Sequence, residues 1–109
     1  MKRKYLLFSL LLAGSSLYAQ EWPAVRPEAR PATRWWWLGS AVDATKLTYN
    51  LEEYAKAGLG GVEITPIYGV QGNDKNNLPF LSPQWMNMLQ HTDAEGKRIG
   101  TEVDMNTGT

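Results

Sequence analysis

Acidic and amide side chains alternate with apolar ones in two short stretches of the sequence. Glu63 lies between Val62 and Ile64, and Asp104 and Asn106 belong to a second alternating stretch, over residues 101–106. Alternate side chains of a strand point to opposite faces, so each stretch presents one polar face. Carboxylates and amides bind sugar hydroxyls, and glycoside hydrolases need two carboxylates across the bond that they cleave. We therefore take Glu63, Asp104 and Asn106 as candidate carbohydrate-binding residues.

Three consecutive tryptophans form a further candidate site, in Arg34-Trp35-Trp36-Trp37-Leu38. The face of an indole ring is a surface on which the C–H face of a sugar can stack. In a strand Trp36 faces opposite to Trp35 and Trp37, so at least one ring must pack in a core. Trp37 lies nearest the carboxyl end of this strand, where β/α barrels place their active sites. We therefore predict that Trp37 contacts substrate.

Helical patterns separate these stretches and must position them. Asp43 is expected as a helix N-cap, and Gly58 as the end of that helix. Glu52 and Lys56 are expected to form an i, i+4 ion pair on its solvent-facing side. Ser82 and Pro83 have the order of a second helix start, and Gly100 ends it. Strands are expected over residues 34–38, 60–66 and 101–106, with a long polar loop over 67–81. The β-α-β-α-β order predicts a parallel sheet with right-handed crossovers.

Both a doubly wound sheet and a closed barrel fit this order. Helices cover both faces of a doubly wound sheet, which would bury Glu63, Glu102 and Asp104 at a cost. In a barrel, one face of each strand lines the lumen. The first strand is not followed by a glycine-rich phosphate-binding turn. We therefore expect an α/β fold, the first β-α-β-α-β segment of an incomplete (β/α)8 TIM barrel, because a closed barrel needs ~250 residues.

Residues 1–19 have the pattern of a secretory signal peptide. Lys2-Arg3-Lys4 is the positive segment, an apolar run follows, and small residues lead to a cut after Ala19. The apolar run is short for a bilayer core of ~30 Å. We expect an exported protein, periplasmic or extracellular, with no stable membrane insertion after cleavage.

The segment 20–33 contains Pro23, Pro27 and Pro31 and is expected to be an extended arm, or a disordered linker in its first half. Residues 34–109 then form the N-terminal part of the barrel domain. Of the 11 basic residues, signal cleavage removes three and leaves eight against 11 acidic ones, a net charge of −3. Nucleic-acid recognition needs clustered Lys and Arg, so no nucleic-acid partner is expected.

Several long words of the sequence resemble, in order, the start of family 106 glycoside hydrolases, which are exported bacterial α-L-rhamnosidases of plant-polysaccharide breakdown. The resemblance runs from about Pro31 to the end of the chain. The words are Arg34-Trp35-Trp36-Trp37-Leu38-Gly39-Ser40-Ala41-Val42, the stretch over residues 50–70, Phe80-Leu81-Ser82-Pro83-Gln84-Trp85-Met86 and Val103-Asp104-Met105-Asn106-Thr107-Gly108-Thr109.

The resemblance implies a (β/α)8 catalytic domain that hydrolyses rhamnosidic bonds by inversion with two glutamates and depends on calcium. The family continues past Thr109, and its catalytic glutamates lie on later strands. The acid and base are therefore expected beyond Thr109, the metal ligands are unassigned, and this chain alone is expected to be inactive. Gly96 departs from the pattern, which leads us to expect Ala there.

Alternatives remain open at this point. The chain could be a non-catalytic carbohydrate-binding module, although such modules are usually built from antiparallel strands, or part of a barrel glycosidase for another sugar. Glu63 could form a structural bridge to Arg34 or to a later strand. Asp74 and its neighbours Asn73, Asn76 and Asn77 could offer oxygens to calcium, but turn formation is the favoured interpretation. His91 is expected on the surface.

Overall fold

The computed structural model describes residues 21–106, so the predicted signal peptide over 1–19 and the final three residues lie outside it. The fold is α/β, with three parallel strands and two α-helices, as predicted. The elements in chain order are η1 (Pro27–Ala29), β1 (Ala32–Leu38), α2 (Ala44–Lys56), β2 (Gly61–Ile67), η2 (Asp74–Asn76), α3 (Pro83–Ile99) and β3 (Glu102–Met105).

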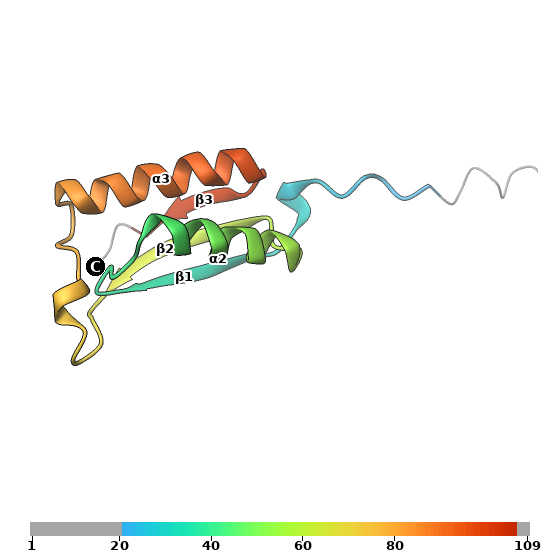
Figure 1. The fold of residues 1–109 in the computed structure, drawn as a ribbon. Helices are drawn as coiled ribbons and strands as arrows, with labels where there is room; N and C mark the ends of the chain where they lie inside the picture. The colour runs from blue at the N-terminus through green and yellow to red at the C-terminus, as the bar shows by residue number, and fades with distance from the viewer. Residues whose placement is uncertain (1–20, 107–109) are drawn as a thin grey trace, which may run out of the picture.

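The strands follow one another in space in the order β1-β2-β3, and α2 and α3 run alongside them on the same side of the sheet (Figure 1). The core lies between the helices and this side of the sheet. Its buried members are Trp35 and Trp37 from β1, Val62 and Ile64 from β2, Leu47 and Leu51 from α2, and Trp85 from α3. The opposite face of the sheet carries no helix within residues 21–106.

The helix ends form as predicted. The Asp43 side chain accepts a hydrogen bond from the backbone N–H of Lys46 at 2.9 Å, and this bond lowers the pKa of the Asp43 carboxyl. Ser82 caps α3 by accepting from Trp85 N at 3.3 Å, with Pro83 in the first helical position. Gly58 and Gly100 adopt positive φ angles of 93° and 79° just beyond the two helices, a conformation that favours glycine.

The strand limits differ from prediction by one or two residues, most clearly at Pro66. We expected β2 to end there, but it continues to Ile67. Ile64 O accepts from Asn106 N at 2.9 Å, and alternate residues of a parallel strand face the same neighbour. The missing N–H of Pro66 therefore faces the β3 side, beyond Met105, where the ladder between β2 and β3 has ended.

Helix α3 approaches β3 very closely at Gly96. A Cβ atom on Gly96 would lie 2.5 Å from Val103 Cγ2 and 2.9 Å from Thr101 O. Gly96 is fully enclosed by these neighbours and is buried. The departure noted in the sequence therefore has a steric reason, because alanine does not fit in this packing.

The proline-rich arm is less extended than predicted. Pro27–Ala29 forms a single 3-10 turn, and Ala32 and Thr33 already belong to β1. Gly60 N donates to Pro31 O at 2.9 Å, and a Cβ on Gly60 would lie 2.1 Å from Pro27 O. The arm is thus held against the amino end of β2 by contact with a residue that has no side chain.

Gly60→Ala should detach this part of the arm. The new methyl group meets backbone, so overpacking of about 1–3 kcal/mol is expected. Cleavage by a glutamate-specific protease after Glu28 should therefore become about tenfold faster or more, while cleavage after Glu21 should not change. Gly72→Ala is the control for strain without contact with the arm: its φ of 85° also disfavours a side chain, but no atom lies within 4 Å of its Cβ position. Equal cleavage at Glu28 in both variants would contradict the packing described.

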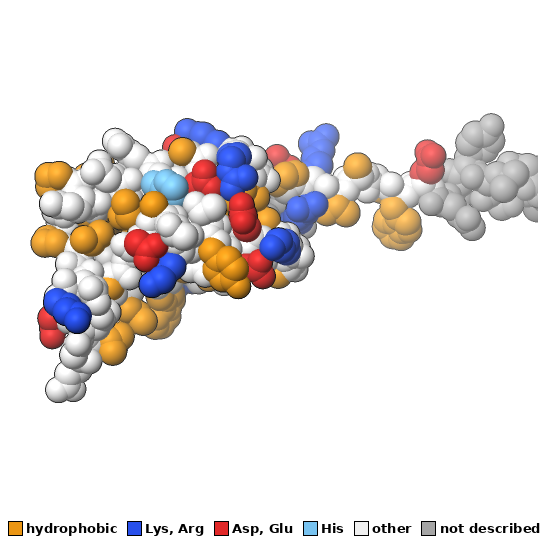
Figure 2. All heavy atoms as spheres, viewed as in Figure 1, with side chains coloured by type: hydrophobic (Ala, Val, Ile, Leu, Met, Phe, Trp, Pro, Cys, Tyr) orange, Lys and Arg blue, Asp and Glu red, His pale blue; other side chains and the backbone are white. Residues whose placement is uncertain are grey.

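The helical side of the molecule is covered by charge of both signs. Figure 2 shows acidic and basic side chains intermingled over α2 and α3. Four ion pairs lie within single helices or their caps: Lys46 with Asp43, Lys56 with Glu53, Lys97 with Asp93, and Arg98 with Glu95. Within residues 21–106, no helix has the length and hydropathy needed to cross a membrane.

Candidate functional site

The face of the sheet opposite the helices, which we call the open face, carries most of the predicted site. The parallel register aligns Arg34, Glu63 and Asp104 in one row across the three strands. Trp36 pairs with Thr65 in the next row toward the carboxyl ends of the strands. Register and alternation together place these side chains on the face away from Ile64 and the core.

Glu63 is held by its neighbours on this face. Arg34 Nε lies 3.5 Å from Glu63 Oε1, and Thr65 Oγ1 donates to the same oxygen at 3.5 Å. The Glu63 side chain remains 37% exposed. The bridge to Arg34 was one of the two interpretations of Glu63, and it leaves the carboxylate oriented by a cation while still open to solvent.

The tryptophans divide as the strand alternation requires, and the exposed one is Trp36. Trp37 is 1% exposed and packs edge-on against Trp35 and Trp85, with ring centroids 6.0 Å apart in both pairs. Trp36 is 58% exposed. Stacking needs an accessible ring face, which Trp37 does not have here. Trp37 therefore lies in the core, apart from the other candidate residues. Trp36 is the tryptophan that shares the open face with them.

Asp104 and Asn106 lie at the β3 side of the open face. Asp104 is exposed and its Oδ1 accepts from Met105 N at 2.9 Å. Asn106 follows the end of β3 and is partly buried, and its backbone N–H extends the pairing with β2. The structure thus brings Glu63 and Asp104 together on adjacent strands and places Asn106 next beyond them.

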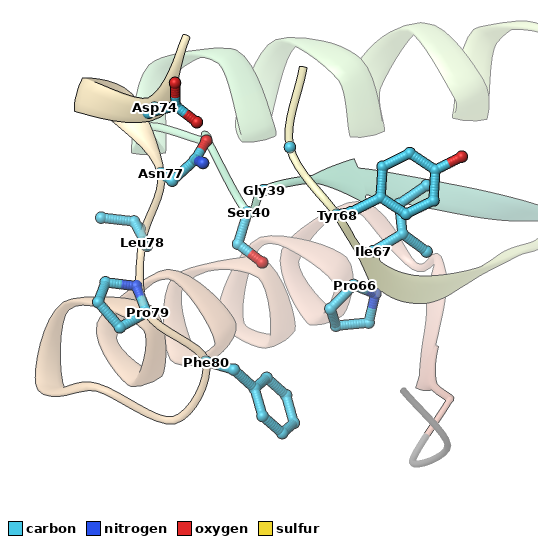
Figure 3. Close-up of a pocket in the computed structure, with 11 residues that line it drawn as sticks. Gly39, Ser40, Pro66, Ile67, Tyr68, Asp74, Asn77, Leu78, Pro79 and Phe80 are labelled. Carbon is cyan, nitrogen blue, oxygen red and sulfur yellow. The ribbon is translucent and has the colours of Figure 1, made fainter. Parts of the chain in front are cut away.

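A pocket of about 650 Å³ lies at the carboxyl ends of β1 and β2 (Figure 3). Its walls come from the turn after β1, the end of β2 and the loop between β2 and α3. Two aromatic side chains on its rim are exposed, Tyr68 and Phe80. Phe80 packs on Trp85 with ring centroids 4.9 Å apart, and Trp85 Nε1 donates to the buried Ser40 Oγ at 2.9 Å. The Phe80 side of the pocket therefore rests on the core.

Asn77 lines this pocket, whereas the sequence favoured it as a turn residue and offered only calcium as an alternative ligand. Its amide occupies the space where side chains at Gly39 and Gly69 would lie, since a Cβ at either position would come within 2.2 Å or 2.6 Å of it. Gly39 O accepts from Leu78 N at 3.1 Å, which fastens the loop to the turn. The available signal was a glycine directly after the first strand and another soon after the second.

The Asx-rich loop is used for a turn, the interpretation favoured from the sequence. Asn76 Nδ2 donates to Asn73 Oδ1 at 2.6 Å across η2. Asp74 is exposed at the pocket rim, and within residues 21–106 no three acidic or histidine side chains gather into a metal-binding group. Calcium remains an expectation from the resemblance alone.

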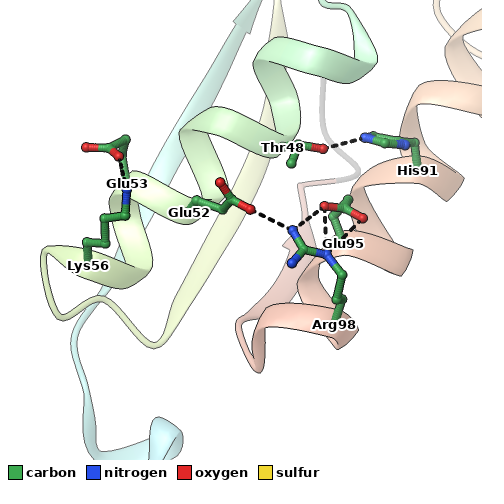
Figure 4. A network of polar contacts seen from close by, with 7 residues as sticks. All are labelled: Thr48, Glu52, Glu53, Lys56, His91, Glu95 and Arg98. Carbon is green, nitrogen blue, oxygen red and sulfur yellow. Dashed lines mark hydrogen bonds and ion pairs between the residues drawn. The ribbon is translucent and has the colours of Figure 1, made fainter.

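His91 joins the two helices instead of standing free on the surface. Its Nε2 lies 2.9 Å from Thr48 Oγ1, and Arg98 Nη2 binds both Glu52 at 2.8 Å and Glu95 at 2.7 Å (Figure 4). The hydrogen bond from Arg98 lowers the pKa of the Glu95 carboxyl. The expected pairing of Glu52 with Lys56 was wrong. These contacts cross from α2 to α3 and are remote from the open face.

Neither a search of protein-family models nor a search of curated proteins found a match to this chain. The resemblance to family 106 glycoside hydrolases therefore remains a prediction from the sequence.

Proposed function

We propose that this chain is the first β-α-β-α-β part of an exported barrel glycoside hydrolase resembling α-L-rhamnosidases, and that its open face forms part of the sugar-binding wall. One observation carries the proposal. An exposed tryptophan, Trp36, lies on the same sheet face as an oriented carboxylate, Glu63. Sugar-binding sites combine these two kinds of surface, one for the C–H face of the ring and one for its hydroxyls.

The arrangement of strands and helices supports the barrel part of the proposal. A doubly wound sheet reverses its strand order so that helices cover both faces. Here the strand order is sequential and the core between helices and sheet lies on one side only. The face of such a sheet that has no helices can line the lumen of a barrel. In barrels, substrate binds at the carboxyl ends of the strands.

The chemistry that we propose for the full-length protein is inversion at the anomeric carbon. One glutamate on a later strand protonates the leaving oxygen while another activates water on the opposite face of the sugar. The residues of this chain bind and orient: Trp36 stacks on the sugar, and Glu63, held by Arg34, accepts from a hydroxyl group. Neither residue is assigned a proton-transfer role.

The test uses the full-length protein with 4-nitrophenyl α-L-rhamnoside and the matching galactoside and glucoside. Release from the rhamnoside alone, with the first-formed sugar of inverted configuration by NMR, is expected. Faster release from another glycoside would transfer the proposal to that sugar. Binding of rhamnosides without release would favour a carbohydrate-binding module. The 109-residue chain should not turn over the rhamnoside at the rate of the full-length enzyme.

Trp36→Ala should weaken substrate binding by the full-length enzyme. Loss of the stacking surface is expected to raise KM for the rhamnoside about tenfold, equivalent to roughly 1.4 kcal/mol, without a comparable loss of thermal stability because Trp36 is exposed. Trp22→Ala is the control, since Trp22 is 92% exposed on the arm. A KM equal to that of the unaltered enzyme would remove Trp36 from the site.

A further inference from the structure

We propose that the pocket between the carboxyl ends of β1 and β2 and the loop to α3 is a second sugar subsite, which binds a pyranose ring next to the one that is cleaved. The inference rests on the proposed function. None of the predicted carbohydrate-binding residues lines this pocket, whose walls come from the turn after β1, the end of β2 and the loop between β2 and α3.

The position of the pocket separates it from the open face. Pro66, which lines it, belongs to the side of β2 that carries Val62 and Ile64, whereas Glu63 points the other way. Ile67, on the Glu63 side, also lines the pocket. The pocket therefore lies over the strand ends and reaches the margin of the open face, where the next unit of a bound sugar chain would emerge.

The dimensions and walls of the pocket suit a sugar ring. Small-molecule sites have volumes of roughly 300–1,000 Å³ and combine apolar walls with a few placed polar groups, and this one measures about 650 Å³. Tyr68, 84% exposed, and Phe80 offer aromatic surface at its rim. Pro66, Leu78 and Pro79 supply aliphatic surface between them (Figure 3).

Asn77 supplies the placed polar group. Figure 3 shows its amide directed from the loop toward the strand ends, in the space that Gly39 and Gly69 leave open. Within residues 21–106 its Oδ1 is buried without a hydrogen-bond partner. An unpaired buried acceptor costs about 1–3 kcal/mol, so the amide is held there against its own hydrogen-bonding preference. The unpaired Oδ1 can accept a hydrogen bond from a sugar hydroxyl group, and Nδ2 of the same amide can donate to a ring or hydroxyl oxygen.

The test compares two substrates of the full-length enzyme: 4-nitrophenyl α-L-rhamnoside, with one sugar, and a rhamnose-capped trisaccharide, with two more. Tyr68→Ala and Asn77→Ala should each lower the ratio of kcat/KM for the trisaccharide to that for the aryl glycoside about tenfold. Tyr49→Ala and Asn87→Ala are matched controls, because both side chains are exposed on helices away from the pocket. The control ratios should equal that of the unaltered enzyme.

Each other outcome has a separate meaning. If the unaltered enzyme cleaves neither substrate, the proposed function fails before the subsite is reached. If it cleaves both and Tyr68→Ala leaves the ratio unchanged, the subsite proposal is overturned. Tyr68 is so exposed that its loss should not unfold the protein, and circular dichroism of each variant checks this. An equal fall with both substrates would place the pocket at the cleaved sugar, which also overturns the proposal.

Discussion

Trp37→Ala should lower the free energy of unfolding of the protein by about 3–5 kcal/mol, the range for removal of a buried aromatic side chain. The Trp37 ring is 1% exposed and joins the strand layer to the helix layer through Trp35 and Trp85. Its removal leaves a cavity at the centre of the core. The indole N–H has no partner among residues 21–106, so the predicted loss comes from packing and not from a broken hydrogen bond.

Urea denaturation of Trp37→Ala and Trp36→Ala compares the stability contributions of a buried and an exposed tryptophan in the same strand. Trp36 has most of its surface in solvent, so its variant should lose at most a small part of that free energy. The two variants should therefore show opposite profiles: Trp37→Ala is unstable, whereas Trp36→Ala is stable but weak in substrate binding. Equal losses of stability would contradict the assignment of the two side chains to opposite faces of the sheet.

Gly96→Ala should be destabilising by about 1–3 kcal/mol, as expected for overpacking. Helix propensity alone predicts the reverse, because Ala is favoured over Gly by ~1 kcal/mol inside a helix. The difference comes from the contact with β3, where the added methyl group would meet Val103 Cγ2 at 2.5 Å and Thr101 O at 2.9 Å. The backbone oxygen cannot move away as a flexible side chain would.

Thermal or urea unfolding of two further variants separates these effects. Ala94→Gly, at an exposed position of the same helix, should cost about 1 kcal/mol from propensity. Adding Val103→Ala to Gly96→Ala should recover part of the loss, since it removes the nearest atom. A gain of stability in Gly96→Ala by itself would show that helix propensity dominates and that α3 can move away from β3.

The local structure was predictable because its signals lie within a few residues of one another. Asp43 and Ser82 cap their helices, and Gly58 and Gly100 end them, for reasons that are visible in the sequence. The alternation around Glu63 also predicted which side chains share a face. These features need only local backbone geometry, which is why they did not depend on knowledge of the packing.

The predictions that failed concern contacts between residues that are distant in the sequence. The alternation of Trp35, Trp36 and Trp37 shows that they face opposite ways, but β1 is aromatic on both faces, so only its pairing with Ile64 reveals which face is core. Glu52 was expected to pair with Lys56, but it forms an ion pair with Arg98 of α3. The Asn77 side chain packs between a turn after β1 and a loop after β2, and no local sequence pattern connects these two segments.

The sequential order of the strands has a consequence for how the molecule forms. Each strand pairs with the strand that precedes it in the chain, and one α-helix lies in the connection between them. The described sheet therefore contains no pairing between strands that are not consecutive in the chain. The first residues of the paired strands are 29 positions apart for β1 and β2 (Ala32 and Gly61) and 41 positions apart for β2 and β3 (Gly61 and Glu102). Loop-closure entropy is lost before either pairing forms, and the loss is smaller for the shorter connection. The β1-α2-β2 unit can therefore assemble first and serve as the template onto which α3 and β3 dock.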